Sequence, residues 1–174
     1  MYVQYITLVL LTTGAALADL RGGKVPNSMI ASGLLCGAAG SVFDRGLSGL
    51  LLCAWGAALP LLLLAPLWYF HMIGAGDIKL LSMAGAFCGP EASFRILIYT
   101  FLIGGIFSFV LLIRRGTFHS RFHYFLSYLK SLDGKKVPSY LDGVSEDGRF
   151  CFVLPVLFGV LWETLPAFAG ILPF

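Results

Sequence analysis

The stretch Leu47–Tyr69, LSGLLLCAWGAALPLLLLAPLWY, contains 23 residues and no charged side chain. A helix of about 20 apolar residues crosses the hydrocarbon core of a bilayer, so this stretch predicts a membrane-spanning helix. Its two prolines, Pro60 and Pro66, are expected to kink the helix or to end it early. The whole chain is similar, with 58% hydrophobic residues, 12% charged residues and a mean hydropathy of +0.87. The sequence therefore predicts an all-α polytopic membrane protein.

Five further apolar runs lie around this stretch, and together they predict six transmembrane helices. The runs are Tyr2–Ala18, Asn27–Phe43, Leu47–Tyr69, Ile78–Glu91, Phe94–Ile113 and Phe150–Gly170. The fourth run is the shortest and is interrupted at Gly89-Pro90. Residues 114–149 form the only extended hydrophilic stretch. We therefore expect a single membrane domain over residues 1–174, with a cytoplasmic loop at about 114–149.

Basic residues are concentrated in alternate loops of this six-helix arrangement. Ten of the twelve Lys and Arg residues fall in three segments, which are Arg21 with Lys24, Lys79, and residues 114–149. Cytoplasmic loops carry an excess of Lys and Arg, so these three segments are placed in the cytoplasm and both termini outside. If the fourth segment entered and left the membrane on the same side, the basic loop at 114–149 would lie outside the cytoplasm. The positive-inside rule therefore favours six spans. Basic residues segregated in this way do not indicate nucleic-acid binding.

Two aspartates lie at the cytoplasmic ends of predicted helices. Asp19 ends the first apolar run and Asp77 begins the fourth, so both lie at one membrane face although 58 residues separate them. Ionisable groups at membrane edges are costly and are kept mainly where they act. If the two carboxyl groups meet in a poorly solvated site, they cannot both ionise easily and one proton is shared. One group then activates water as the base and the other polarises a carbonyl as the acid, with the assignment left open.

This arrangement predicts direct hydrolysis of a peptide bond, without a covalent intermediate, a cofactor or a metal. The residues around the aspartates suit that chemistry. Gly74 and Gly76 permit unusual backbone angles and the close approach of an extended substrate. Pro26 and Asn27 favour a defined turn between the first two helices. Lys79 has two open roles, which are contact with lipid phosphate and lowering of the pKa of an acidic group.

Two motifs carry a resemblance to a known family. Gly74-Ala75-Gly76-Asp77-Ile78-Lys79-Leu80 matches the GxGDxKL signature of type IV prepilin peptidases. Asp19-Leu20-Arg21 followed by Val25-Pro26-Asn27 matches the family's second aspartate element, D-x-R-x(3)-[IV]-P-N. A GxGD element alone also suits presenilin-like and signal-peptide-peptidase-like enzymes, whereas the pair of motifs is specific. The resemblance implies that Asp19 and Asp77 are the catalytic aspartates and that Arg21 belongs to the site.

The same resemblance implies a substrate and a location. The substrate would be a prepilin or pseudopilin that has a membrane-embedded helix and a short basic leader. The cut would follow a glycine at the cytoplasmic face of a bacterial inner membrane. Larger bifunctional members carry an added domain with Cys-x-x-Cys pairs, and this sequence has no such pair. The chain therefore resembles the short, peptidase-only branch that serves Flp-type (tight-adherence) pili, and N-methylation of the pilin is not expected.

Two other interpretations compete with an enzyme. In the first, the chain is a small transporter subunit that relays protons or cations through Asp19, Asp77 and Lys79. That interpretation expects acidic groups near the bilayer midplane, whereas both aspartates lie at one edge. In the second, Asp77 only caps the helix that follows it. His119 and His123 have the i, i+4 spacing of metal ligands, but no further ligand accompanies them, so no metal site is predicted.

Overall fold

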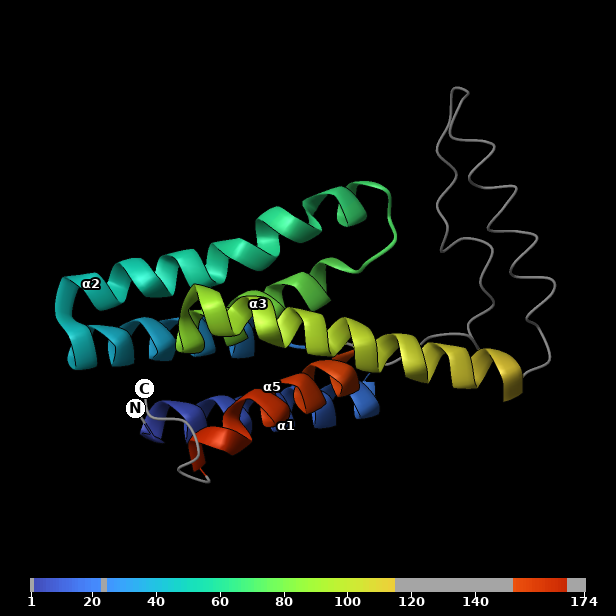
Figure 1. The fold of residues 1–174 in the computed structure, drawn as a ribbon, viewed down its shortest axis with the longest axis horizontal. Helices are drawn as coiled ribbons and strands as arrows, with labels where there is room; N and C mark the ends of the chain where they lie inside the picture. The colour runs from blue at the N-terminus through green and yellow to red at the C-terminus, as the bar shows by residue number, and fades with distance from the viewer. Residues whose placement is uncertain (1, 23–24, 115–151, 169–174) are drawn as a thin grey trace.

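The computed structural model describes residues 2–22, 25–114 and 152–168, and every regular element in these ranges is an α-helix (Figure 1). The helices are α1 (Tyr2–Gly22), α2 (Asn27–Tyr69), α3 (Ala75–Arg114) and α5 (Val153–Phe168). The all-α prediction is therefore confirmed for this part of the chain. Apart from Arg114, the predicted loop at 114–149 lies outside the described residues, as do His119 and His123 within it.

Helices α2 and α3 each consist of two helices that meet at a glycine. Gly46 has φ 63° and ψ −141°, and Gly89 has φ 80° and ψ 177°. Residues with a Cβ avoid these backbone conformations, whereas glycine adopts them at no steric cost. The chain reverses its direction at both points, so α2 and α3 are helical hairpins (Figure 1). The interruption predicted at Gly89-Pro90 is confirmed.

The second half of α2 continues through Pro60 and Pro66 to Tyr69, so the expectation that these prolines would end it early is wrong. The helix ends instead in a left-handed cap at His71, which has φ 54°. Two backbone hydrogen bonds of 2.9 Å close this cap, from the N–H groups of His71 and Met72 to carbonyls of the last turn. They satisfy carbonyl groups that a helix end otherwise leaves without partners. The cap turns the chain into the short loop before α3.

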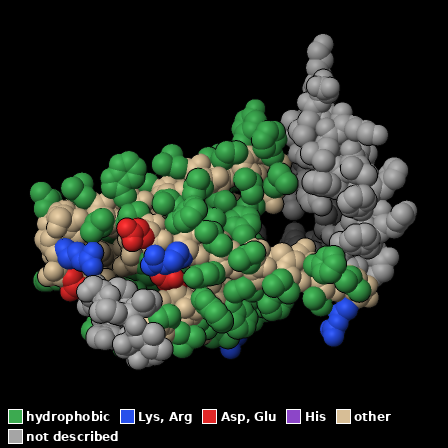
Figure 2. Space-filling view, viewed as in Figure 1, with side chains coloured by type: hydrophobic (Ala, Val, Ile, Leu, Met, Phe, Trp, Pro, Cys, Tyr) green, Lys and Arg blue, Asp and Glu red, His purple; other side chains and the backbone are tan. Residues whose placement is uncertain are grey.

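The described helices have the length and surface of membrane-spanning segments. Three are long and apolar enough to cross a membrane, over Val3–Gly22, Asn27–Tyr69 and Ala75–Leu111, and α5 is a shorter apolar helix. Large apolar side chains lie over much of the outer surface (Figure 2). Phe43 and Leu47, for example, are 91% and 77% exposed. Soluble monomers rarely expose so much apolar surface, so the chain is a membrane protein.

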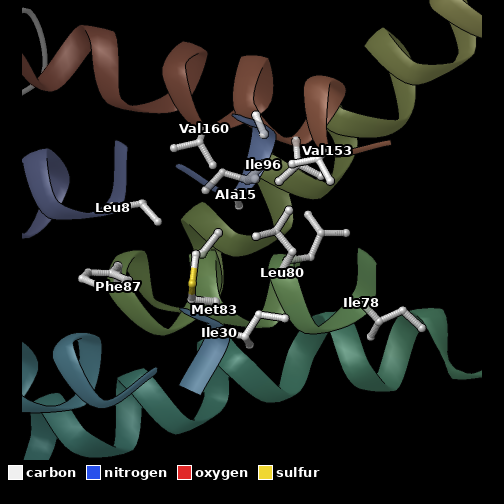
Figure 3. Close-up of a cluster of buried hydrophobic side chains, with 14 of the residues drawn as sticks. Leu8, Ala15, Ile30, Ile78, Leu80, Met83, Phe87, Ile96, Val153 and Val160 are labelled. Carbon is white, nitrogen blue, oxygen red and sulfur yellow. The ribbon is translucent and has the colours of Figure 1, made fainter. Parts of the chain in front are cut away.

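One apolar core joins all four helices (Figure 3). Its buried members include Leu8 and Ala15 of α1, Ile30 of α2, Leu80, Met83, Phe87 and Ile96 of α3, and Val153 and Val160 of α5. Helix α3 contacts each of the other three helices. The burial of these side chains therefore fixes the position of α3 within the bundle.

Glycines bring the two hairpins into backbone contact. A Cβ at Gly56 in α2 would overlap with the carbonyl oxygen of Gly85 in α3, and the converse also holds. At the same crossing, Ser93 Oγ donates a 3.0 Å hydrogen bond to the Gly56 carbonyl oxygen. Small residues permit this close approach of two helices in a membrane. The crossing sets the position of α3, and with it Asp77, relative to α2.

Candidate active site

Asp77 lies in the first turn of α3 and is partly buried. Its N–H donates to the Gly74 carbonyl oxygen over 3.2 Å, which begins the helix. Its carboxylate turns back toward Gly74. A Cβ at Gly74 would lie 3.1 Å from Asp77 Oδ2. Asp77 is thus the third residue of α3 and not its N-cap, and its carboxyl group lies against Gly74.

Asp19 lies in the last turn of α1 and is also partly buried. Its carboxyl group is near enough to that of Asp77 for the two to interact electrostatically. The end of α1 and the starts of α2 and α3 lie at one end of the bundle, opposite the start of α1 and the end of α5 (Figure 1). The structure thus brings together two aspartates that are 58 residues apart in the sequence.

A hydrogen bond joins the two motifs directly. Lys79 Nζ, near the start of α3, donates to Oδ1 of Asn27, the first residue of α2, over 3.3 Å. Both side chains are exposed. Among the described residues, Lys79 forms no ion pair with Asp19 or Asp77. Sequence reasoning missed this contact, because motif spacing says nothing about how two helices are rotated relative to each other.

The two glycines of the GAGD segment have different surroundings. Neither glycine has a positive φ. Among the glycines in the described ranges, only Gly46 and Gly89 do. Gly74 and Gly76 thus do not adopt the left-handed backbone conformations that glycine permits. Gly74 provides room for the Asp77 carboxylate, whereas a Cβ at Gly76 would meet no atom within 4 Å. Gly76 thus leaves open space on the exposed side of the site.

The remaining predicted site residues flank the connection between α1 and α2. Pro26 is the N-cap of α2, with φ −62° and ψ 132°. Its carbonyl oxygen accepts the N–H of Met29 over 3.1 Å, so the predicted turn leads directly into α2 at Asn27. Arg21 is exposed in the last turn of α1, where a cation complements the negative end of a helix.

The chemistry that this arrangement offers is proton transfer. Two neighbouring carboxyl groups that share one proton can act as a proton acceptor and a proton donor. Within residues 2–22, 25–114 and 152–168, no three His, Cys, Asp or Glu side chains converge as a set of metal ligands.

The sequence was also compared with known proteins. Residues 5–109 match the family model of the type IV leader peptidase family. The matched range contains both aspartate motifs. Neither the curated proteins nor the solved structures gave a match.

Proposed function

Because the chain belongs to the type IV leader peptidase family, we propose that Asp19 and Asp77 are the catalytic pair of this peptidase. Its substrates are type IV prepilins or pseudopilins with a membrane-embedded helix, cut at the cytoplasmic face of a bacterial inner membrane. One observation carries the proposal. The two motif aspartates lie at the same end of the bundle, although one belongs to the last turn of α1 and the other to the first turn of α3 (Figure 1).

The proposed reaction uses the single proton that the pair shares. The ionised carboxylate takes a proton from water, and the water oxygen attacks the scissile carbonyl carbon. The protonated carboxyl gives its proton to the carbonyl oxygen, which forms a tetrahedral diol. The diol collapses when one of its hydroxyl protons returns to the pair and a proton is delivered to the leaving nitrogen. The carbon–nitrogen bond then breaks, and the pair again holds one proton.

We propose six membrane-spanning segments with both termini outside. The turns at Gly46 and Gly89 divide α2 and α3 into two helices each, and α1 and α5 supply the other two. The start of α1 and the end of α5 lie at the bundle end opposite the aspartates (Figure 1). Arg45 and Arg95 are close in sequence to the two glycine turns, whereas Lys79 is close to Asp77. This distribution supports a cytoplasmic position for the aspartates.

Within the family, we assign the chain to the peptidase-only branch that serves Flp-type pili. This assignment is supported by the fact that none of the four cysteines forms a Cys-x-x-Cys pair in this sequence. A pilin processed by this chain alone is therefore expected to keep an unmethylated N-terminus.

A cleavage assay tests the proposed function. Purified protein in lipid vesicles is expected to cut a pilin precursor once, between the leader and the mature pilin. Mass spectrometry of the product gives both the cut position and any added methyl group. The rate is expected to be the same with a metal chelator present, because the proposed pair acts on water without a metal. Folded protein that cuts no precursor but carries protons across the vesicle membrane would instead support the transporter interpretation.

A further inference from the structure

The hydrogen bond from Lys79 Nζ to Asn27 Oδ1 spans 3.3 Å and connects residues 52 positions apart. Asn27 belongs to the motif that contains Asp19, and Lys79 lies two residues after Asp77. This Lys79–Asn27 contact therefore joins the two aspartate motifs through side chains other than the aspartates. The roles that the sequence suggests for Lys79, contact with lipid phosphate and lowering of the pKa of an acidic group, do not include this contact.

The start of α2 leaves the Asn27 side chain able to make this contact. Asparagine at a helix start commonly caps the helix with its side chain. In α2, however, the N-cap is Pro26, and the structure shows no side-chain cap there. The Pro26 carbonyl oxygen begins the helix by accepting the N–H of Met29. The amide oxygen of Asn27 instead accepts the hydrogen bond from Lys79.

Helix geometry directs Lys79 away from the catalytic carboxyl group. Residues two apart in an α-helix project about 200° from each other around the helix axis, so Lys79 and Asp77 lie on different faces of α3. Ile78 and Leu80, on either side of Lys79, are 5% and 0% exposed and belong to the core. Their burial fixes this part of α3. Lys79 therefore acts on the site through α2 and not by touching the aspartates.

The other end of the contact is also held by the core. Ile30, three residues after Asn27, is 4% exposed and belongs to the core. Val25, two residues before Asn27, packs against the same core. The core therefore positions both backbones, and the hydrogen bond adds a direct connection between the starts of α2 and α3, away from the crossing at Gly56 and Gly85.

We propose that Lys79 is a positioning residue for leader-peptide cleavage and that Asn27 is its partner. The Lys79–Asn27 contact holds the first turn of α3, which carries Asp77, at a set distance from the start of α2. It thereby restrains the first turn of α3 at the end of the bundle where the last turn of α1, with Asp19, also lies (Figure 1). This inference rests on the proposed function of the aspartate pair. It replaces both contact with lipid phosphate and direct action on an acidic group as the role of Lys79.

A double-mutant cycle tests the contact. Lys79→Met and Asn27→Ala are each expected to lower kcat for a pilin precursor about fivefold to tenfold, with KM unchanged. The double variant is expected to lose no more than either single variant, because both substitutions remove the same hydrogen bond. The reciprocal exchange, Lys79→Asn with Asn27→Lys, restores a donor and an acceptor and is expected to return kcat to within about twofold of the original chain.

Arg114→Met is the matched control, because Arg114 is an exposed basic residue of α3 outside the site. This variant is expected to cleave like the original chain. Losses that multiply in the double variant would show that Lys79 and Asn27 act separately and would overturn the proposal. A raised KM with unchanged kcat overturns it as well, since Lys79 would then contact substrate. An exchange variant as slow as Lys79→Met would also overturn it.

Melting temperatures of the same proteins separate this inference from the proposed function. If the contact exists, Lys79→Met and Asn27→Ala lower the melting temperature by similar small amounts, and the double variant lowers it no further. That coupling is measured without any cleavage. If the melting temperatures show this coupling but the original chain cleaves no precursor, the proposed function is overturned. The role of the contact in cleavage is then overturned with it. Normal cleavage without coupling in either measurement overturns the positioning role alone.

Discussion

Asp77→Asn is expected to lower cleavage of a pilin precursor by about 10²–10⁴-fold, and Asp19→Asn by a similar factor. A positioned acid or base contributes about this much to a rate, and an amide cannot take a proton from water. Asparagine has nearly the same shape as aspartate, so the side chain at position 77 can keep its place beside Gly74. Both variants should therefore fold, insert and melt like the original chain. Initial cleavage rates in vesicles, normalised to folded protein, measure the effect.

Glu91→Gln is the matched control for these two substitutions. Glu91 is exposed, and it lies beside the Gly89 turn instead of near the aspartates. Its neutralisation removes one carboxylate from the same helix and is expected to leave the cleavage rate within about twofold of the original. If Asp19→Asn or Asp77→Asn cleaves at a rate similar to that of Glu91→Gln, the two aspartates are not the catalytic pair.

Gly74→Ala is expected to lower kcat about 3-fold to 10-fold. A Cβ at this position would lie 3.1 Å from Asp77 Oδ2, so the carboxylate must shift slightly to make room. A displacement of about 1 Å of a catalytic group can cost about 100-fold in rate, and this smaller shift is expected to cost correspondingly less. The substitution adds no strain to the backbone, because Gly74 does not have a positive φ. Steady-state kinetics should therefore show a loss in kcat without a loss of folded protein.

Gly105→Ala controls for the general effect of adding a methyl group to a glycine of α3. A Cβ at Gly105 meets no atom within 4 Å, so this variant is expected to keep the original kcat. Equal rates for Gly74→Ala and Gly105→Ala would show that the position of the Asp77 carboxylate does not limit the reaction.

The sequence predicted the helices well because charge-free runs and glycine breaks are local features. The run Leu47–Tyr69 and the interruption at Gly89-Pro90 both appear in the structure as expected. Pro60 and Pro66 do not end the helix early, because a proline within an apolar run does not by itself end a membrane helix. The helix ends where the left-handed cap at His71 forms. Glycine is the usual residue in a left-handed helix cap, so a histidine in a sequence does not indicate a helix end in the same way.

The site was only partly predictable, for a related reason. Asp19 and Asp77 could be paired because a topology assigns each helix end to one side of the membrane. The contact between Lys79 and Asn27 depends on the rotation of α2 and α3 about their axes, which burial of residues such as Ile30 sets. The sequence pattern of the motifs contains no such information.

The central claim is that Asp19 and Asp77 form one water-activating site. The most direct test is the separation of their nearest carboxyl oxygens in an experimental structure of the protein in lipid with an uncleaved precursor bound. Each hydrogen bond to a shared water spans about 2.6–3.2 Å, so the two bonds together allow a separation of at most about 6.4 Å. A clearly larger separation with the precursor in place would contradict the claim, because no single water could then reach both groups.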